Sequence, residues 1–237
     1  MNRNFINRWL LLTTFILVSL MSSDINAQVV AQDGTKYNTT KIGDREWLTT
    51  NLNVSTFNDG TTILQVKSVA EWIKAYNEKK PAYCYYDFQD SNGTKYGKIY
   101  NSHVLNNPLN VAPIGWHVPT VEDWKELIAT LGGNANKEKI VNELKAKTGW
   151  TRSPGNNKTG FTALGSGTLI FISNKYLFQG LPNWARYWSS SYYTEGYFKP
   201  IREYFYQAGL NLFENTFQID PFGFNEGSAI RCIKDKK

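Results

Sequence analysis

The first 27 residues limit which part of the chain can fold, because they have the layout of a secretory signal peptide. Arg3 and Arg8 lead into an uncharged run from Trp9 to Met21, and the polar segment Ser22–Asn26 ends at Ala27. The run is shorter than the ~20 apolar residues that cross a bilayer core, so we expect cleavage rather than retention as an anchor. The mature chain, with no transmembrane segment left, would work in the periplasm, at the cell surface or outside the cell.

The mature residues 28–237 are long enough to form a single domain around one hydrophobic core, since a chain of this size buries roughly 70% of its unfolded surface. The full chain carries 26 Lys and Arg against 20 Asp and Glu. These charges are dispersed rather than massed in one block, which indicates a solvated surface and not a nucleic-acid partner. Aromatic residues make up 15% of the chain and suit either a core or a flat recognition surface.

The two cysteines, Cys84 and Cys232, are expected to pair in an oxidising compartment. Such a disulfide would fix the last segment of the chain to its first third. Two buried thiols that pack as small apolar residues are the alternative. A catalytic thiol is disfavoured, because neither cysteine has a histidine close to it in the sequence.

Capping residues and apolar periodicity predict helices. One is expected from Ser68 to Lys79, where Glu71 completes a capping box, and a stretch over Glu138–Lys147 is also helical in pattern. A further helix is expected after Thr120, which Asp123 follows at the capping-box spacing. Its predicted buried face and its end are Val121, Trp124, Leu127, Ile128, Leu131 and Gly132–Gly133.

Short extended segments separated by turn residues predict antiparallel strands. Ala82–Phe88 and Gly97–Asn101 are expected to form a hairpin with Asn92–Gly93 at its tip. Further predicted strands are Lys36–Ile42, Glu46–Leu48, Leu169–Ile172, Tyr187–Tyr193, Glu203–Tyr206, Asn211–Gln218 and Ala229–Lys234. Helices beside such strands indicate an α+β fold.

Familiar catalytic and cofactor motifs are missing from the sequence. It has no phosphate-binding glycine loop, no Gly-x-Ser-x-Gly elbow, no His-Glu-x-x-His and no paired CxxC. His103 and His117 are interpreted as structural hydrogen-bonding residues. Asp87, Asp90 and Asn92 lack the closing Glu of a calcium loop, so no metal and no cofactor is expected.

The densest aromatic cluster, around Trp184–Tyr193, is the predicted ligand contact. On an extended strand Arg186, Trp188 and Tyr192 share one face, while Tyr187 and Tyr193 share the other. Rings and a planar guanidinium suit sugar recognition, although a half-buried core strand explains the same pattern. The predicted contact residues are Trp184, Arg186, Tyr187, Trp188, Tyr192 and Tyr193.

An ordered set of short motifs resembles the Fibrobacter succinogenes major paralogous domain, a family of secreted or surface bacterial domains. The motifs are Asp33–Tyr37, Lys41–Trp47, Asn51–Leu52, Tyr96–Asn101, Gly115–Thr120, Trp124, Gly160–Phe161, Tyr187–Ser191 and Ile230–Asp235. The family looks related to the C-type lectin superfold, which formylglycine-generating enzymes share. The resemblance implies helices beside irregular antiparallel sheets, with the chain ends close together, but no particular activity.

This chain departs from the family pattern at two places. Ala112 stands where many relatives have a Cys, which weakens the predicted bridge from Cys84 to Cys232. The lectin calcium motif is incomplete, because Pro182–Asn183 lacks a flanking acid and Ser189 follows Trp188. The expected function is therefore an exported, non-catalytic binding domain for a glycan or a surface protein. The alternatives are a metal-dependent oxidase that uses Cys232 or His117, and a structural part of an envelope assembly.

Overall fold

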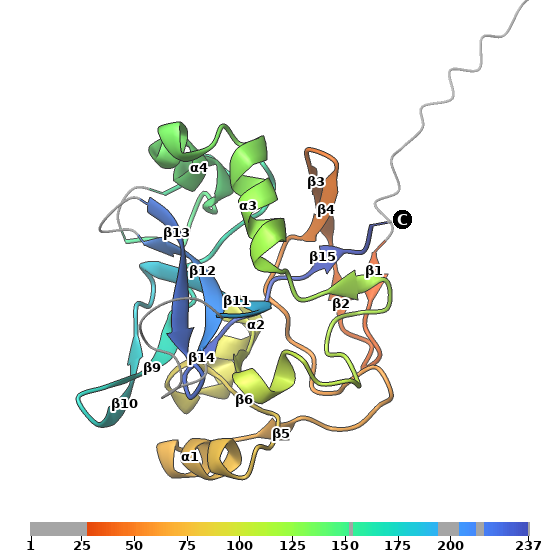
Figure 1. The fold of residues 1–237 in the computed structure, drawn as a ribbon, viewed down its shortest axis with the longest axis vertical. Helices are drawn as coiled ribbons and strands as arrows, with labels where there is room; N and C mark the ends of the chain where they lie inside the picture. The colour runs from red at the N-terminus through yellow and green to blue at the C-terminus, as the bar shows by residue number, and fades with distance from the viewer. Residues whose placement is uncertain (1–27, 152–153, 194–203, 212–215, 237) are drawn as a thin grey trace, which may run out of the picture.

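The computed structural model describes residues 28–151, 154–193, 204–211 and 216–236, so the predicted leader of residues 1–27 lies outside the described part. The described chain combines helices with four sheets, and Figure 1 shows the helices at the periphery of the sheets. The predicted α+β class is confirmed. No helix in the described ranges is both long and apolar enough to cross a membrane.

A four-stranded antiparallel sheet joins the start of the described chain to its end. Its order is β3 (Thr39–Ile42), β4 (Arg45–Leu48), β15 (Ile233–Lys234) and β8 (Trp116–His117). Ile233 pairs with Trp47 on one side and with His117 on the other. Next to it, β1 (Val29–Val30) and β2 (Lys36–Tyr37) form a two-stranded ribbon.

The largest sheet has six strands and is antiparallel except where β5 meets β6. Its order is β10 (Lys175–Gln179), β9 (Thr168–Ile172), β14 (Gly227–Ser228), β7 (Ile99–Asn101), β6 (Ala82–Cys84) and β5 (Leu64–Gln65). The sequence pattern did not predict β10, which pairs with β9 along its whole length.

The predicted hairpin at residues 82–101 is right in its pairing and wrong in its turn. Tyr83 on β6 pairs with Tyr100 on β7, as expected. The connection contains the 3-10 turns η1 (Tyr86–Phe88) and η2 (Asp90–Asn92), followed by α2 (Gly93–Tyr96). Gly93 is buried in helical conformation, and a Cβ there would lie 2.3 Å from the ring of Tyr85, so this glycine serves close packing rather than a tight turn.

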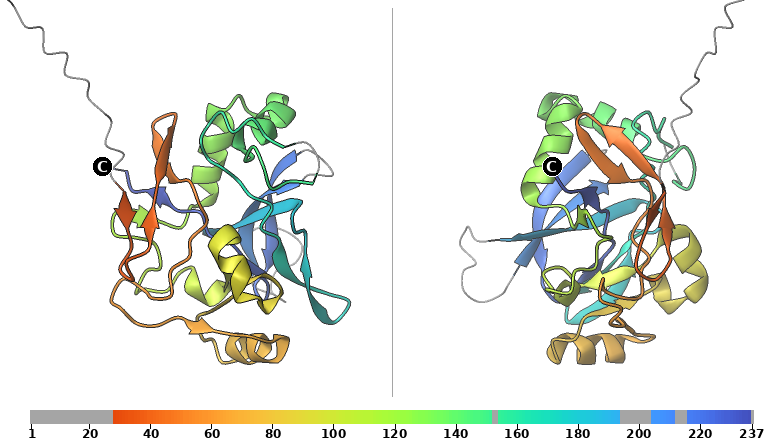
Figure 2. Two further views of the ribbon diagram at one scale, coloured as in Figure 1. Left: turned by 180° about the vertical axis from the view of Figure 1, so that it is seen from behind. Right: turned by 90° about the vertical axis from the view of Figure 1, so that its right-hand side faces the viewer.

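The central sheet is antiparallel, in the order β11 (Trp184–Tyr192), β12 (Tyr204–Asn211) and β13 (Thr216–Gly223). Its register places Trp188 opposite Gln207, and Gln207 opposite Asp220. The pairing of β11 with β12 shifts between Trp188 and Tyr192, which marks a bulge near the end of the strand. The views in Figure 2 place this sheet between α3 and the six-stranded sheet.

The helices begin where the capping residues predict. Ser68 caps α1 (Val69–Asn77) by accepting from the Glu71 amide. Thr120 and Asp123 form a complete capping box at the start of α3 (Val121–Thr130). The remaining helical segments are η3 (Ser102–Val104), η4 (Asn134–Asn136) and α4 (Lys137–Leu144). Trp72 on α1 is buried, whereas Ile73, expected on the same stripe, is 38% exposed.

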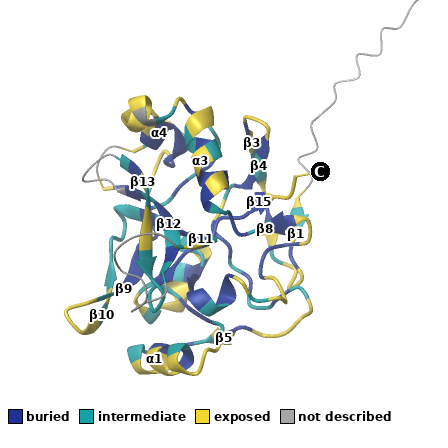
Figure 3. Ribbon diagram, in the orientation of Figure 1, coloured by how far each residue is buried: buried dark blue, intermediate teal, exposed yellow. Residues whose placement is uncertain are grey.

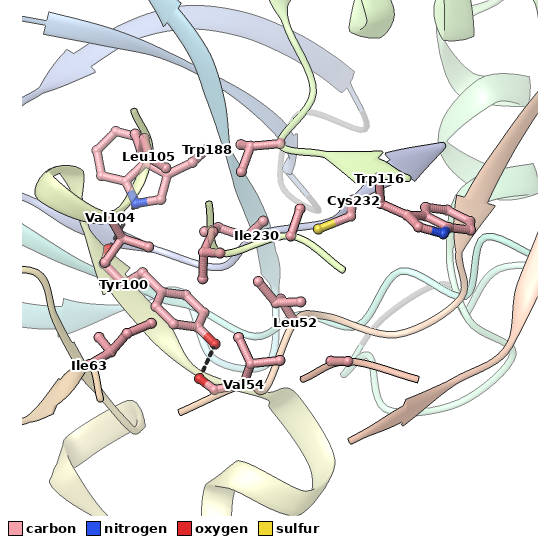
Figure 4. Packing of buried hydrophobic residues seen from close by; sticks show 14 of the residues in the cluster. Leu52, Val54, Ile63, Tyr100, Val104, Leu105, Trp116, Trp188, Ile230 and Cys232 are labelled. Carbon is pink, nitrogen blue, oxygen red and sulfur yellow. Dashed lines mark hydrogen bonds between the residues drawn. The ribbon is translucent and has the colours of Figure 1, made fainter. Parts of the chain in front are cut away.

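Buried hydrophobic side chains form three clusters, and Figure 3 shows exposed residues along the outer sides of α1 and α4. Consecutive residues of β11 enter two of them. Tyr187 packs with Trp124 and Phe161, whereas Trp188 joins the cluster that contains Tyr100. The Trp188 indole donates to the Tyr100 carbonyl at 2.8 Å, and Figure 4 shows the Tyr100 hydroxyl bonded to the Val54 carbonyl.

The predicted disulfide is wrong, because Cys84 and Cys232 are free in the structure. Cys84 packs beside Trp72 in one cluster, whereas Cys232 packs near Trp116 in another. Both thiols are fully buried, and this burial raises the pKa of each well above its usual value. The alternative interpretation, two buried thiols that pack as apolar residues, describes the structure.

Candidate functional site

Burial divides the predicted contact residues into two groups. Tyr187 and Trp188 are fully buried, so they are core residues and cannot contact a ligand in this structure. This part of the sequence interpretation fails because β11 is covered on both faces at these two positions. Trp184, Arg186 and Tyr193 are half-buried, and Tyr192 is 49% exposed.

The accessible part of β11 brings a guanidinium against two aromatic rings. Arg186 lies opposite Gly209 on β12, where a Cβ would lie 3.4 Å from the arginine Cγ, an ordinary contact distance. Its guanidinium carbon is 5.3 Å from the Trp184 ring centroid and 4.9 Å from that of Phe222 on β13. Such contacts are cation–π interactions, which hold the arginine in place.

Several polar atoms near this arginine are buried without a hydrogen-bond partner. Gln207 is 1% exposed, and neither its amide oxygen nor its amide nitrogen is hydrogen-bonded. The Trp184 indole nitrogen and one carboxylate oxygen of Glu226 are also buried without a hydrogen-bond partner. We call Trp184, Arg186, Gln207, Phe222 and Glu226 the Arg186 site. Buried polar groups are normally paired, so these atoms indicate places for water or ligand.

The carboxyl group of Glu226 is the titratable acid of this site. One oxygen accepts from the Phe171 amide at 3.3 Å, and the other is buried without a partner. Burial raises the pKa of Glu226 to about 7, against the opposing effects of the Phe171 amide and the positive charge of Arg186. This group therefore changes its charge near neutral pH.

A second aromatic feature lies at the far end of the β11–β12 pair. Tyr193 lies near two tyrosines of β12, with ring centroids 6.3 Å from Tyr204 and 5.4 Å from Tyr206. The ring centroids of Tyr192 and Phe205 are 4.3 Å apart, and Tyr192 is half exposed. Tyr192 therefore lies on the same face of the sheet as Arg186, whereas Tyr193, Tyr204 and Tyr206 lie on the opposite face.

His117 is held between two carboxylates, which supports its interpretation as a structural residue. Its Nδ1 lies 2.6 Å from Asp235 and its Nε2 lies 3.1 Å from Asp123. The hydrogen bond to Asp123, followed by that to Asp235, raises the pKa of His117 against the opposing effect of burial. The hydrogen bonds from His117 and Thr120 lower the pKa of Asp123, although its burial acts in the opposite sense. A role as a base would require one of these contacts to break.

A pocket of about 640 Å³ lies beside this ion-pair cluster. Its lining residues are Lys41, Asp44, Arg45, Glu46, Glu126, Lys234, Asp235 and Lys236. The lining holds four basic and four acidic side chains, several of which pair with each other, as Lys234 does with Glu46 and Lys236 does with Glu126. The lining therefore favours neither anionic nor cationic ligands.

His103 also has structural contacts: its Nε2 lies 3.0 Å from the Tyr76 carbonyl and its ring stacks on Tyr76. Among the residues that the structure describes, no three His, Cys, Asp or Glu side chains are grouped to hold a metal ion. Sequence reasoning missed Gln207 and Glu226, since neither residue stands in a recognisable motif and their lack of partners is visible only in three dimensions.

The chain matches the Fibrobacter succinogenes major domain family over residues 40–234. It belongs to this family. The resemblance inferred from the ordered motifs is therefore confirmed, and all residues of the Arg186 site lie inside the match. Neither the curated proteins nor the solved structures gave a match to this chain.

Proposed function

We propose that this family member is an exported, non-catalytic domain that binds a glycan at the Arg186 site. The observation that carries the proposal is the contact of the Arg186 guanidinium with the rings of Trp184 and Phe222, all three of them half-buried. Export rests on the signal-peptide pattern of residues 1–27 and implies the periplasm, the cell surface or the medium.

The chemistry of the site suits a sugar better than a purely apolar ligand. Aromatic rings pack against the C–H faces of a sugar, and the half-exposed Tyr192 extends this surface. Arginine donates several hydrogen bonds in a fixed plane. A few polar groups among rings are the usual means by which a binding site fixes the orientation of its ligand.

A C-type-lectin-like fold belongs to the same proposal. Its support is the pairing of β15 with β4, which brings the last described strand beside an early one, together with helices packed beside antiparallel sheets. The oxidase alternative is less well supported, because the Cys232 thiol is buried with a raised pKa and both ring nitrogens of His117 face carboxylates. No observation favours a structural role in an envelope assembly over binding.

The test is a glycan array probed with residues 28–237, followed by affinity measurements on the glycans that bind. Arg186→Ala should weaken binding by at least about tenfold, since it removes donors at the centre of the site. Lys125→Ala is the matched control, because this exposed lysine on α3 pairs with Glu122 on the helix surface. Wild-type protein that binds no glycan, or Arg186→Ala protein that binds as tightly as the control, would contradict the proposal.

A further inference from the structure

The hairpin of β9 and β10 ends the six-stranded sheet with a strand whose outer edge is open. Among the described residues β10 pairs with β9 alone, so its other edge has no neighbouring strand. Figure 1 shows the hairpin projecting from the body of the molecule, and Figure 3 shows exposed residues at its tip. Ile172 and Leu177 lie on one face of this hairpin and are 50% and 43% exposed. An open strand edge with exposed apolar side chains is a surface on which another strand can pair.

The turn of the hairpin fixes which backbone groups of β10 face outward. Ser173 and Asn174 both have positive φ, as in the type I′ turn of a two-residue hairpin. The pair of residues that flanks such a turn exchanges hydrogen bonds, and hydrogen-bonded pairs alternate with non-hydrogen-bonded pairs along an antiparallel ladder. Tyr176 and Phe178 come one and three residues after the flanking Lys175, so their amide and carbonyl groups point away from β9.

We propose that two copies of this chain associate through β10, which pairs antiparallel with itself around a twofold axis at Leu177. In this register the outward amide and carbonyl groups of Tyr176 meet those of Phe178 in the second copy, and each such pair exchanges two backbone hydrogen bonds. The two six-stranded sheets then join into one continuous sheet. The proposal is independent of glycan binding, because no residue of the Arg186 site lies on β10.

The side chains of β10 are self-complementary in this register. From Lys175 to Gln179 the strand is polar, aromatic, aliphatic, aromatic and polar, with Leu177 at its centre. An antiparallel copy therefore places leucine against leucine, tyrosine against phenylalanine and lysine against glutamine. On β9, Ile170 lies opposite Leu177 on the same face, so the pairing forms one apolar row that runs across both copies.

The charge of Lys175 favours this register over its neighbours. With the axis at Leu177, the Lys175 side chains of the two copies lie four residues apart along the strands, roughly 13 Å. An axis at Tyr176 would instead set each lysine opposite a leucine, and an axis at Lys175 would set the two charges opposite each other, which is destabilising. A lysine on an open edge normally prevents pairing, but here it prevents only the wrong registers.

Sedimentation equilibrium of residues 28–237 tests the association. A single-strand contact is smaller than a standard interface, so we expect a dissociation constant on the order of 100 μM, measurable at concentrations up to about 1 mM. Leu177→Lys sets two like charges opposite each other on the axis and should raise this constant at least about tenfold. The matched control is Leu64→Lys, which should dimerise like wild type, because Leu64 is 45% exposed on β5 at the other edge of the same sheet. Wild-type protein that stays monomeric throughout, or a Leu177→Lys protein that dimerises as the control does, would overturn the proposal.

Cysteine substitution tests the register, and it decides the proposal if the Leu177→Lys protein is unfolded. Leu177→Cys brings two thiols together in a non-hydrogen-bonded pair, whose Cα atoms lie about 4.5 Å apart, within the span of a disulfide. Cys84 and Cys232 are fully buried, so the substitution adds the single accessible thiol. Oxidised Leu177→Cys protein should form a covalent dimer on a non-reducing gel, whereas Lys175→Cys protein, with its thiols far apart, should not. Equal cross-linking of the two variants, or a wild-type dimer without cross-linking of Leu177→Cys, would overturn the pairing through β10.

Discussion

Tyr187 and Trp188 are consecutive residues of one strand, yet they pack into two different hydrophobic clusters. The β11 strand therefore joins two parts of the core along a single stretch of backbone. Its central residues hold the fold together, and only its two ends remain accessible for a ligand. This division separates the substitutions that should unfold the protein from those that should change binding alone.

Replacement of Trp188 tests whether the central residues of β11 hold the fold together. Trp188→Ala removes a fully buried indole and its hydrogen bond to the Tyr100 carbonyl, so we expect a loss of about 3–5 kcal/mol of unfolding free energy. Tyr192→Ala, at the exposed end of the strand, should cost less than about 1 kcal/mol. Urea denaturation measures both, and similar losses for the two variants would refute the division.

His117 should make stability depend on pH. Because its folded pKa is raised, its ion pairs contribute stability that is fully present below the unfolded value near 6.5. That contribution is lost as the pH rises through the raised folded value. The wild-type protein should therefore melt at a higher temperature than His117→Gln at pH 5.5. The difference between the two melting temperatures should be smaller at pH 8.5. A difference independent of pH would show that the histidine contributes through packing alone.

Glu226 should also make the folded protein less stable as the pH rises, because its carboxyl group is buried and loses its proton. Its folded pKa is raised to about 7, so folding favours the protonated acid, and stability falls as the pH rises from the unfolded value near 4.5 through 7. Glu226→Gln should therefore be more stable than wild type at pH 8, by at most about 3 kcal/mol, with no such advantage at pH 4. Denaturation curves at both values test this, and a less stable variant at pH 8 would contradict it.

Arg231 carries a buried charge that is held by neutral groups. Its guanidinium donates to the Leu48 and Phe161 carbonyls and to the Asn51 side chain at 2.7 Å, and it lies 4.4 Å from the Phe161 ring centroid. Lysine cannot reproduce this planar set of donors, so Arg231→Lys should cost about 3 kcal/mol or more in unfolding free energy. Asn51→Ala, which removes one acceptor, should cost less. A folded Arg231→Lys protein of wild-type stability would show that the donor geometry is unimportant.

Local signals in the sequence predicted the helices well. The capping box of Thr120 and Asp123 involves residues three apart, so its geometry follows from the helix itself. The pairing of β6 with β7 was also predictable, but the helical turns between them were not, because they depend on how Gly93 packs against Tyr85. The strand β10 has no clear alternation and was missed.

The sequence could not predict the contacts between residues that are far apart in the chain. The separation of Cys84 from Cys232 along the chain says nothing about which cluster each thiol enters. A strand covered on both faces shows no alternation, so the burial of Tyr187 together with Trp188 was not visible. Gln207 became a candidate only when its lack of partners could be seen.

The most direct test of the account is the affinity of a Trp184→Ala protein for a glycan selected on the array. Trp184 belongs to the accessible end of β11, so its loss should weaken binding at least about tenfold while the melting temperature changes by only a few degrees. Ile114→Ala, at an exposed turn outside the site, should bind like wild type. Wild-type affinity in a folded Trp184→Ala protein would contradict the claim that this end of β11 binds the ligand.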